Sequence, residues 1–174
     1  MNSRQRLQLA LNHQEADRVP FDLGATVLTS IHHKSYRALR QYLGMPEVEP
    51  RIVDIFQQIV AVDDDMRERL KVDVRDVAPR SSAAFRIDIQ EMPGYTYFYD
   101  EWGIGWRMPK DAGWYYDMFD HPLKDAKTIA EIENYNWPDP VDPARFTGMA
   151  ERARQAVTEE QHGVFIGGLC AGIM

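Results

Sequence analysis

Three short apolar runs, separated by stretches of helical periodicity, constrain the fold of this 174-residue chain more than any other feature. The runs read VPFDL at 19–23, VDVRDVA at 72–78 and GVFIGG at 163–168. Short apolar strands that alternate with helices are typical of α/β proteins, in which helical crossovers join parallel strands. The sequence therefore predicts an α/β fold built on a parallel sheet.

Helical patterning recurs before and between these runs. Ser30 is the expected N-cap of one helix, because its hydroxyl can accept from a free backbone N–H. Thr128 and Glu131 have the spacing of a capping box, which predicts a short helix. Asp142 followed by Pro143 predicts the start of another. The longer segments with helical spacing are 3–14, 30–43, 52–70 and 142–159.

The segment 85–119 differs in character from the rest of the chain. It is rich in aromatic and β-forming residues, and its sequence includes YTYFYDEWGIGWRM and WYYDMF. Pro93-Gly94 and Asp111-Ala112-Gly113 are turn signals between the apolar stretches. We therefore expect an antiparallel β-meander inserted between the helical parts of the α/β fold.

Composition excludes several classes of protein. The 20 basic and 27 acidic residues give a formal charge of −7, which argues against a nucleic-acid-binding protein. No apolar run approaches the roughly 20 residues that a membrane-spanning helix needs. The first residues lack the apolar core of a secretory signal. A single cysteine excludes an internal disulfide and suits the cytoplasm, which is the expected location.

The end of the sequence is unusual. The chain stops within VFIGGLCAGIM, an apolar, glycine-rich run, whereas termini are commonly polar and exposed. The three strand candidates are also too few for a closed (β/α)8 barrel, which needs about 250 residues. We therefore expect a fragment of a longer protein.

Several stretches, in this order, resemble the N-terminal part of the uroporphyrinogen decarboxylase-like superfamily on its methyltransferase side. They are RLQLALNHQEADRVPFDLGAT at 6–26, DEWGIGWRM at 100–108 and HPLKDAKTIAEIENYNWPDPVDPARF at 121–146. The resemblance spans almost the whole chain. It implies a partial (β/α)8 TIM barrel over residues 1–174, with N-terminal helices and the 85–119 meander as an insertion. The C-terminal half of the barrel would be absent.

The resemblance also implies an activity. Methyltransferases of this branch move a methyl group between a cobalamin carrier and a thiol or another small acceptor. They hold zinc through a His-x-Cys motif and a distant cysteine in the later half of the barrel. No His-x-Cys occurs in this sequence, so the resemblance assigns neither the zinc nor the cobalamin to a residue of this chain. It implies a corrinoid protein and a small methyl acceptor as partners, and we expect the fragment alone to be inactive.

Two alternative functions remain open. One is decarboxylation of a uroporphyrinogen, whose enzymes carry an Arg-Gln-Ala-Gly-Arg loop after the first strand. The corresponding stretch here, DLGATVLTS at 22–30, has no arginine to pair with the propionates, which argues against that activity. The other is a non-catalytic truncated module. Its exposed sheet edges would drive association with a partner chain or with a second copy.

Candidate substrate-binding residues follow the first strand run. Asp22 ends that run, and the carboxyl ends of barrel strands are where active sites lie. Thr26 belongs to the same loop, and His32 lies just before the next helix. The alternative for Asp22 is that it accepts from the amides of its own turn. The alternative for His32 is that it is exposed or caps the helix.

Three further candidates accompany the later strand runs. Asp73 and Arg75 share one face of the second run, where they either line a pocket or form a structural ion pair. Cys170 follows the third run and would again lie at the carboxyl end of a strand. A lone cysteine is, however, commonly a small buried apolar residue. Asp63, Asp64 and Asp65 are expected on a solvated helix face rather than in a metal site.

Overall fold

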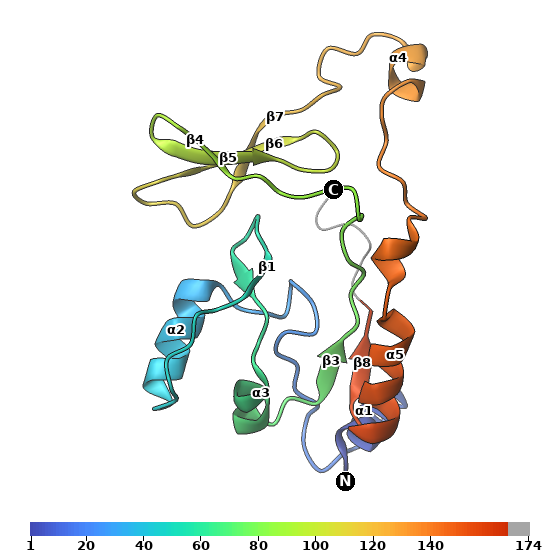
Figure 1. The fold of residues 1–174 in the computed structure, drawn as a ribbon. Coiled ribbons are helices and arrows are strands. Elements are labelled where there is room, and N and C mark those ends of the chain that lie inside the picture. The colour runs from blue at the N-terminus through green and yellow to red at the C-terminus, as the bar shows by residue number, and fades with distance from the viewer. Residues whose placement is uncertain (167–174) are drawn as a thin grey trace. The chain divides into compact units, whose positions relative to one another are not determined.

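The computed structural model describes residues 1–166. The chain divides into two compact units (Figure 1). Unit 1 comprises residues 1–54, 58–79 and those from 147 onward, and unit 2 comprises 55–57 and 80–146. The expected mixed α/β class is confirmed, whereas the described residues form small separate sheets and no closed barrel. None of the described helices is long and apolar enough to cross a membrane.

Unit 1 contains the parallel strands. Strands β3 and β8 pair in parallel, with Val74 opposite Gly163 and Asp76 opposite Phe165, and they lie side by side in Figure 1. The elements of unit 1 are α1 (Ser3–Leu11), α2 (His33–Tyr42), β1 (Ile52–Asp54), β2 (Ile59–Val60), α3 (Asp64–Leu70), β3 (Val74–Asp76), α5 (Met149–Arg154), the π-helical turn η2 (Gln155–Glu159) and β8 (Gly163–Phe165).

The first predicted strand, at 19–23, is not a regular strand. Its backbone lies beside the start of β3, because the Asp73 N–H donates to the Phe21 carbonyl at 2.8 Å. Pro20 has no N–H to donate to a strand ladder, and Val19 is 83% exposed. The segment therefore follows the edge of the parallel pair without joining it as a strand.

The helix predicted over 52–70 is wrong. Residues 52–60 form the short antiparallel pair β1–β2, and the helix α3 begins only at Asp64. Gln58 has a positive φ of 56° in the connecting turn, which ends any helical path. The apolar spacing arises instead from one core, in which residues of β2 and α3 pack on α2. Its buried members are Tyr36, Val60, Val62 and Met66.

The helix predicted to begin after Ser30 starts two residues later than expected. His32 is the N-cap of α2, and its Nδ1 accepts from the Lys34 N–H at 3.2 Å. The Ser30 hydroxyl donates instead to the Val60 carbonyl at 2.7 Å. The tertiary contact with β2 therefore takes the hydroxyl that the sequence pattern assigned to the helix cap.

The helix predicted over 142–159 is divided. Asp142 does cap its start, since its Oδ1 accepts from the Ala144 N–H at 2.9 Å, but the first turn is a 3-10 helix, η1 (Pro143–Phe146). Gly148 then adopts a φ of 74°, a left-handed conformation that interrupts the helix before α5.

Unit 2 contains the expected β-meander. Its four antiparallel strands follow one another in chain order, with Phe98 completely buried beneath the sheet. Glu101 pairs with Arg145 at 2.6 Å, so DEWGIGWRM contacts the end of the 121–146 segment. The predicted Thr128–Glu131 capping box is present at the start of a short helix. The elements are β4 (Gln90–Met92), β5 (Tyr95–Tyr99), β6 (Gly105–Pro109), β7 (Asp117–Asp120) and α4 (Ile129–Glu133).

Candidate functional site

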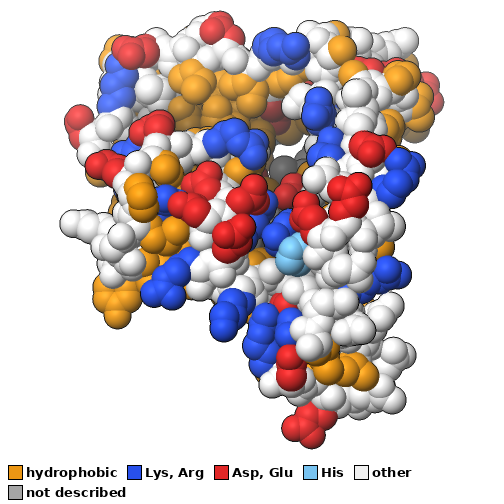
Figure 2. Space-filling model, turned by 60° about the horizontal axis from the view of Figure 1, so that its bottom comes forward, with side chains coloured by type: hydrophobic (Ala, Val, Ile, Leu, Met, Phe, Trp, Pro, Cys, Tyr) orange, Lys and Arg blue, Asp and Glu red, His pale blue; other side chains and the backbone are white. Residues whose placement is uncertain are grey.

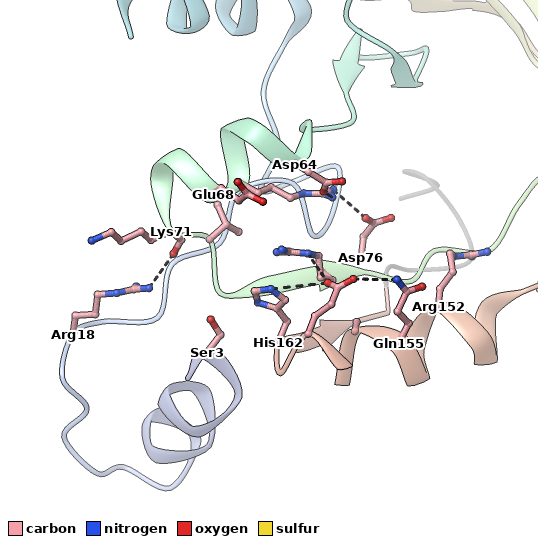
Figure 3. A pocket seen from close by; sticks show the side chains of 14 residues that line it. Ser3, Arg18, Asp64, Glu68, Lys71, Asp76, Arg152, Gln155 and His162 are labelled. Carbon is pink, nitrogen blue, oxygen red and sulfur yellow. Dashed lines mark hydrogen bonds and ion pairs between the residues drawn. The ribbon is translucent and has the colours of Figure 1, made fainter. Parts of the chain in front are cut away.

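A cavity of about 720 Å³ lies within unit 1 (Figure 3). Helix α3 and strand β3 contribute side chains on one side, and η2 with the residues just before β8 contributes on the other. Most of these side chains are charged, and the cavity contains few apolar groups such as Val72 and Ala156. This is the candidate functional site. Its lining favours a polar ligand over an apolar one.

Glu160 is at the centre of the contacts on the η2 side. Its Oε2 lies 3.3 Å from Arg75 Nε and 4.0 Å from His162 Nε2, and its Oε1 accepts from Gln155 Nε2 at 3.3 Å (Figure 3). These residues lie between η2, which ends at Glu159, and β8, which begins at Gly163. Because β8 pairs with β3, the residues that lead into β8 are brought close to β3.

Arg67 holds the opposite side of the cavity. Its Nη1 lies 3.1 Å from Asp64 Oδ1 within α3, and its Nη2 lies 3.5 Å from Asp76 Oδ1 at the end of β3. One arginine therefore bridges the helix and the strand. Acidic and basic side chains interleave around a histidine in the space-filling view as well (Figure 2).

Burial changes the titration of two groups in this cavity. Burial, reinforced by the positive charge of Arg67, lowers the pKa of Arg75 from the ordinary arginine value. Burial, reinforced by Arg75, also lowers the pKa of His162. The lowered pKa favours the neutral form of His162, whose buried Nδ1 makes no hydrogen bond to a described residue.

The first three predicted candidates stabilise local turns. Asp22 Oδ1 accepts from the Ala25 N–H at 3.1 Å, as in the turn alternative. The Thr26 hydroxyl lies 3.1 Å from that of Thr29 and closes the next turn. His32 caps α2, so the capping alternative holds for it as well. None of these three side chains lines the described cavity.

Asp73 and Arg75 do not form the structural ion pair that was one of the two alternatives for them. Asp73 is completely buried and accepts from Arg6 at 2.5 Å, from Arg18 at 2.7 Å and from the Phe21 N–H at 2.8 Å. Asp73, Arg6 and Arg18 therefore form a buried structural ion-pair cluster, which we call the clasp. Arg75 lines the cavity instead, and Cys170 lies outside the described residues.

Sequence reasoning missed Glu160, His162 and Arg67. Glu160 and His162 directly precede the third strand run, and that position is the signal that would have found them. Arg67 lies within the segment 52–70, which was predicted as one helix. That prediction did not indicate that Arg67 lies beside β3. Asp64 is solvated as expected, with a side chain that is 83% exposed, whereas Asp65 also accepts from the buried Arg40 at 2.7 Å.

Comparison of the chain with protein-family models, curated proteins and solved structures found no match. Within residues 1–166, no three His, Cys, Asp or Glu side chains are arranged to hold a metal ion. The site is therefore described by its own side chains alone. It combines charged hydrogen-bond donors and acceptors around an open space.

Proposed function

We propose that this chain is the N-terminal part of a uroporphyrinogen decarboxylase-like (β/α)8 barrel, on the corrinoid-dependent methyltransferase branch. The complete barrel would move a methyl group between a cobalamin carrier and a thiol or other small acceptor. The observation that carries the proposal is the parallel pairing of β3 with β8, whose connection contains the meander and ends in the helix α5. Parallel strands joined through a helix are the repeating unit of such a barrel, and the meander would be an insertion in that unit.

Two further contacts support the same fold. The Phe21–Asp73 backbone hydrogen bond places the first apolar run beside β3, so the three runs neighbour one another in chain order. The Glu101–Arg145 pair joins two of the stretches that resemble the family. In the proposed barrel, the loop that follows residues 19–23 lies at the carboxyl end of the first strand, where substrates bind. Asp22 would shape that loop through its hydrogen bond to Ala25.

The described residues do not fit the zinc ion of this family, because no suitable group of ligands is present among them. The cavity is lined by charged side chains, which do not suit the broad apolar face of a corrin ring. No chemical step is therefore assigned to either group in this chain. The proposed contribution of residues 1–166 is scaffolding: the N-terminal helices, the first strands and the loops that follow them.

The loop after residue 22 favours the methyltransferase branch over the decarboxylase alternative. A decarboxylase of this superfamily needs arginines there for the propionates, and Thr26 and Thr29 close this turn by bonding to each other. The non-catalytic module remains a second candidate, and the observation that favours it is the exposure of apolar residues at the end of β8. Phe165 is 44% exposed and Ile166 is 69% exposed.

Reading the coding sequence beyond Met174 is the first test. A continuation that supplies a His-x-Cys motif allows an extended protein to be made and compared with the 174-residue chain. Titration with cobalamin in the presence of zinc, followed by absorbance, should show binding by the extended protein alone. Methyl transfer by the short chain, or no cobalamin binding by the extended one, would contradict the proposal. A stop codon at this point would favour the module.

A further inference from the structure

We propose that the cavity between α3, β3 and η2 binds an oxyanion, with Arg75 as its principal ligand. The ligand class is a small molecule with a phosphate or a comparable dianionic group. This site is separate from the carboxyl-end loop discussed above, and the inference does not depend on the methyltransferase proposal.

Arg75 lines the cavity and has hydrogen-bond donors beyond those that its described contacts use. Its side chain is only 16% exposed, Nη1 donates to the Val74 carbonyl at 3.1 Å, and Nε lies 3.3 Å from Glu160. A guanidinium carries five N–H donors. No hydrogen bond of its Nη2 is described within residues 1–166, and this nitrogen is not among the buried atoms without a partner, so it is accessible from the cavity. An accessible guanidinium nitrogen can donate charge-assisted hydrogen bonds to an anion.

The charges that face Arg75 come from every element around the cavity. Arg67 lies between Asp64 and Asp76, and Glu160 faces Arg75 itself. Arg18, on the N-terminal side, is paired with Asp73.

At the two ends of the cavity, Lys71 and Arg152 have no carboxylate partner among the described residues (Figure 3). The Arg152 guanidinium donates only to carbonyls, those of Thr147 at 3.3 Å and Ala78 at 2.9 Å. Against these cations stands one carboxylate without a described partner, that of Glu68. A dianion competes better than a single carboxylate for Arg75, because the Coulomb attraction grows with its charge.

The backbone around the cavity contains uncommon conformations. Residues Gln155–Glu159 form a π-helical turn, a rare element that is frequent at functional sites. Lys71 and Gln161 adopt positive φ angles of 57° and 58°, which cost free energy in residues other than glycine. The buried His162 Nδ1 is a further polar atom without a described partner. These features gather at one cavity, which is the expected pattern for a binding site rather than for a solvated surface.

Isothermal titration of the 174-residue chain with inorganic phosphate, pyrophosphate, citrate and chloride tests the proposal. We expect saturable binding of phosphate and pyrophosphate. Saturation by citrate as well would assign the site to oxyanions in general, and its absence would assign the site to phosphate groups. Heats no larger than those of chloride for all three oxyanions would overturn the proposal.

Substitutions locate the site. Arg75→Gln should weaken phosphate binding by about tenfold or more, since a charge-assisted hydrogen bond is lost. Arg69→Gln, on the exposed face of α3, is the matched control and should leave the affinity unchanged. Glu68→Gln removes a repulsive charge and should strengthen binding about twofold. An affinity that falls equally in R75Q and R69Q, or that falls in E68Q, would contradict the assignment even if R75Q folds poorly.

Discussion

Two carboxylates beside β3, those of Asp73 and Glu160, differ in burial and in the number of hydrogen bonds that they receive from arginines. Asp73 is completely buried and receives four hydrogen bonds, three from Arg6 and Arg18 and one from the Phe21 N–H. Glu160 is 37% exposed and contacts Arg75 only through Nε at 3.3 Å. The same two kinds of side chain therefore form a saturated clasp in one place and an incomplete pair in the other.

The difference separates a structural group from a group available for a ligand. The clasp joins α1, the first apolar run and the start of β3, and it leaves neither oxygen of Asp73 without a donor. Removing one partner of such a buried pair leaves an uncompensated charge, which is strongly destabilising. The Arg75–Glu160 pair is open to solvent on one side, so water or an added anion can replace one partner at little cost.

The largest expected effect is therefore at Asp73. Asp73→Asn keeps the shape of the side chain and removes the charge that Arg6 and Arg18 face. We expect the free energy of unfolding of unit 1 to fall by about 3–5 kcal/mol. Far-UV circular dichroism in a urea titration measures this loss, since the longer helices α1, α2 and α3 belong to unit 1.

The same titration contains its own reference. All four tryptophans, Trp102, Trp106, Trp114 and Trp137, lie in unit 2, so fluorescence follows that unit separately. Asp64→Asn, at a side chain that is 83% exposed, is the matched control and should change the circular dichroism midpoint little. Equal loss of stability in the two variants would remove the distinction between the clasp and an ordinary surface pair.

The second expected effect is on acid stability. Burial acts to raise the pKa of the Asp73 carboxyl, but the hydrogen bonds from Phe21, Ser3, Arg18 and Arg6 outweigh it and hold the pKa below the usual value. A lowered folded-state pKa means that this stabilisation is complete above the unfolded value of about 3.9. It is lost as the pH falls through the folded value.

We therefore expect unit 1 of the natural chain to lose stability steeply below about pH 4, the ordinary range of an aspartate. Asp73→Asn should flatten that part of the profile, because the variant no longer binds the proton on unfolding. Urea midpoints measured by circular dichroism across the acid range check this. If the urea midpoint of the variant falls with pH as steeply as that of the natural chain, other carboxylates cause the loss of stability in acid.

The fold was predictable wherever local and tertiary preferences agree. The 85–119 meander has alternating β-forming residues and turn signals that its sheet satisfies, so its existence was found, although its strands span Gln90 to Asp120 and residues 85–89 lie outside them. The 52–70 segment carries spacing that suits a helix, but its first part is β-branched and packs as β1–β2 against α2. Periodicity alone does not distinguish one long helix from a strand pair followed by a short helix, because both arrangements place the same apolar residues in one core.

The site was less predictable than the fold. Arg75 was found because it lies on a strand run, whereas its partner Glu160 follows η2 and is distant in sequence. Asp73 has the same strand parity as Arg75, and only the tertiary position of Arg6 and Arg18 distinguishes the clasp from the cavity. A strand pattern gives the face of a residue. It does not give the neighbours that cover that face.

A third carboxylate lies between the two extremes and sharpens the comparison. Asp63 is 42% exposed, and its Oδ2 accepts from the buried Tyr36 hydroxyl at 2.8 Å. The same hydroxyl accepts from the Asp63 N–H at 3.0 Å, so Tyr36→Phe removes both bonds. We expect a loss of about 1–2 kcal/mol in the urea titration, below that of Asp73→Asn. A change as large as that of Asp73→Asn would show that burial of one partner suffices for a clasp.

The smallest expected effect on stability is at Glu160. Glu160→Gln removes a charge that is more than one-third exposed, so the free energy of unfolding should change by less than about 1 kcal/mol. The amide no longer competes for Arg75, so phosphate binding should become tighter than in the natural chain. Urea titration and isothermal titration of the same preparation measure the two quantities. An incomplete ion pair should leave its arginine available to an anion without loss of stability in the unit around it. A large loss of stability in Glu160→Gln, together with an unchanged phosphate affinity, would therefore show that the Arg75–Glu160 pair is structural, like the Asp73 clasp.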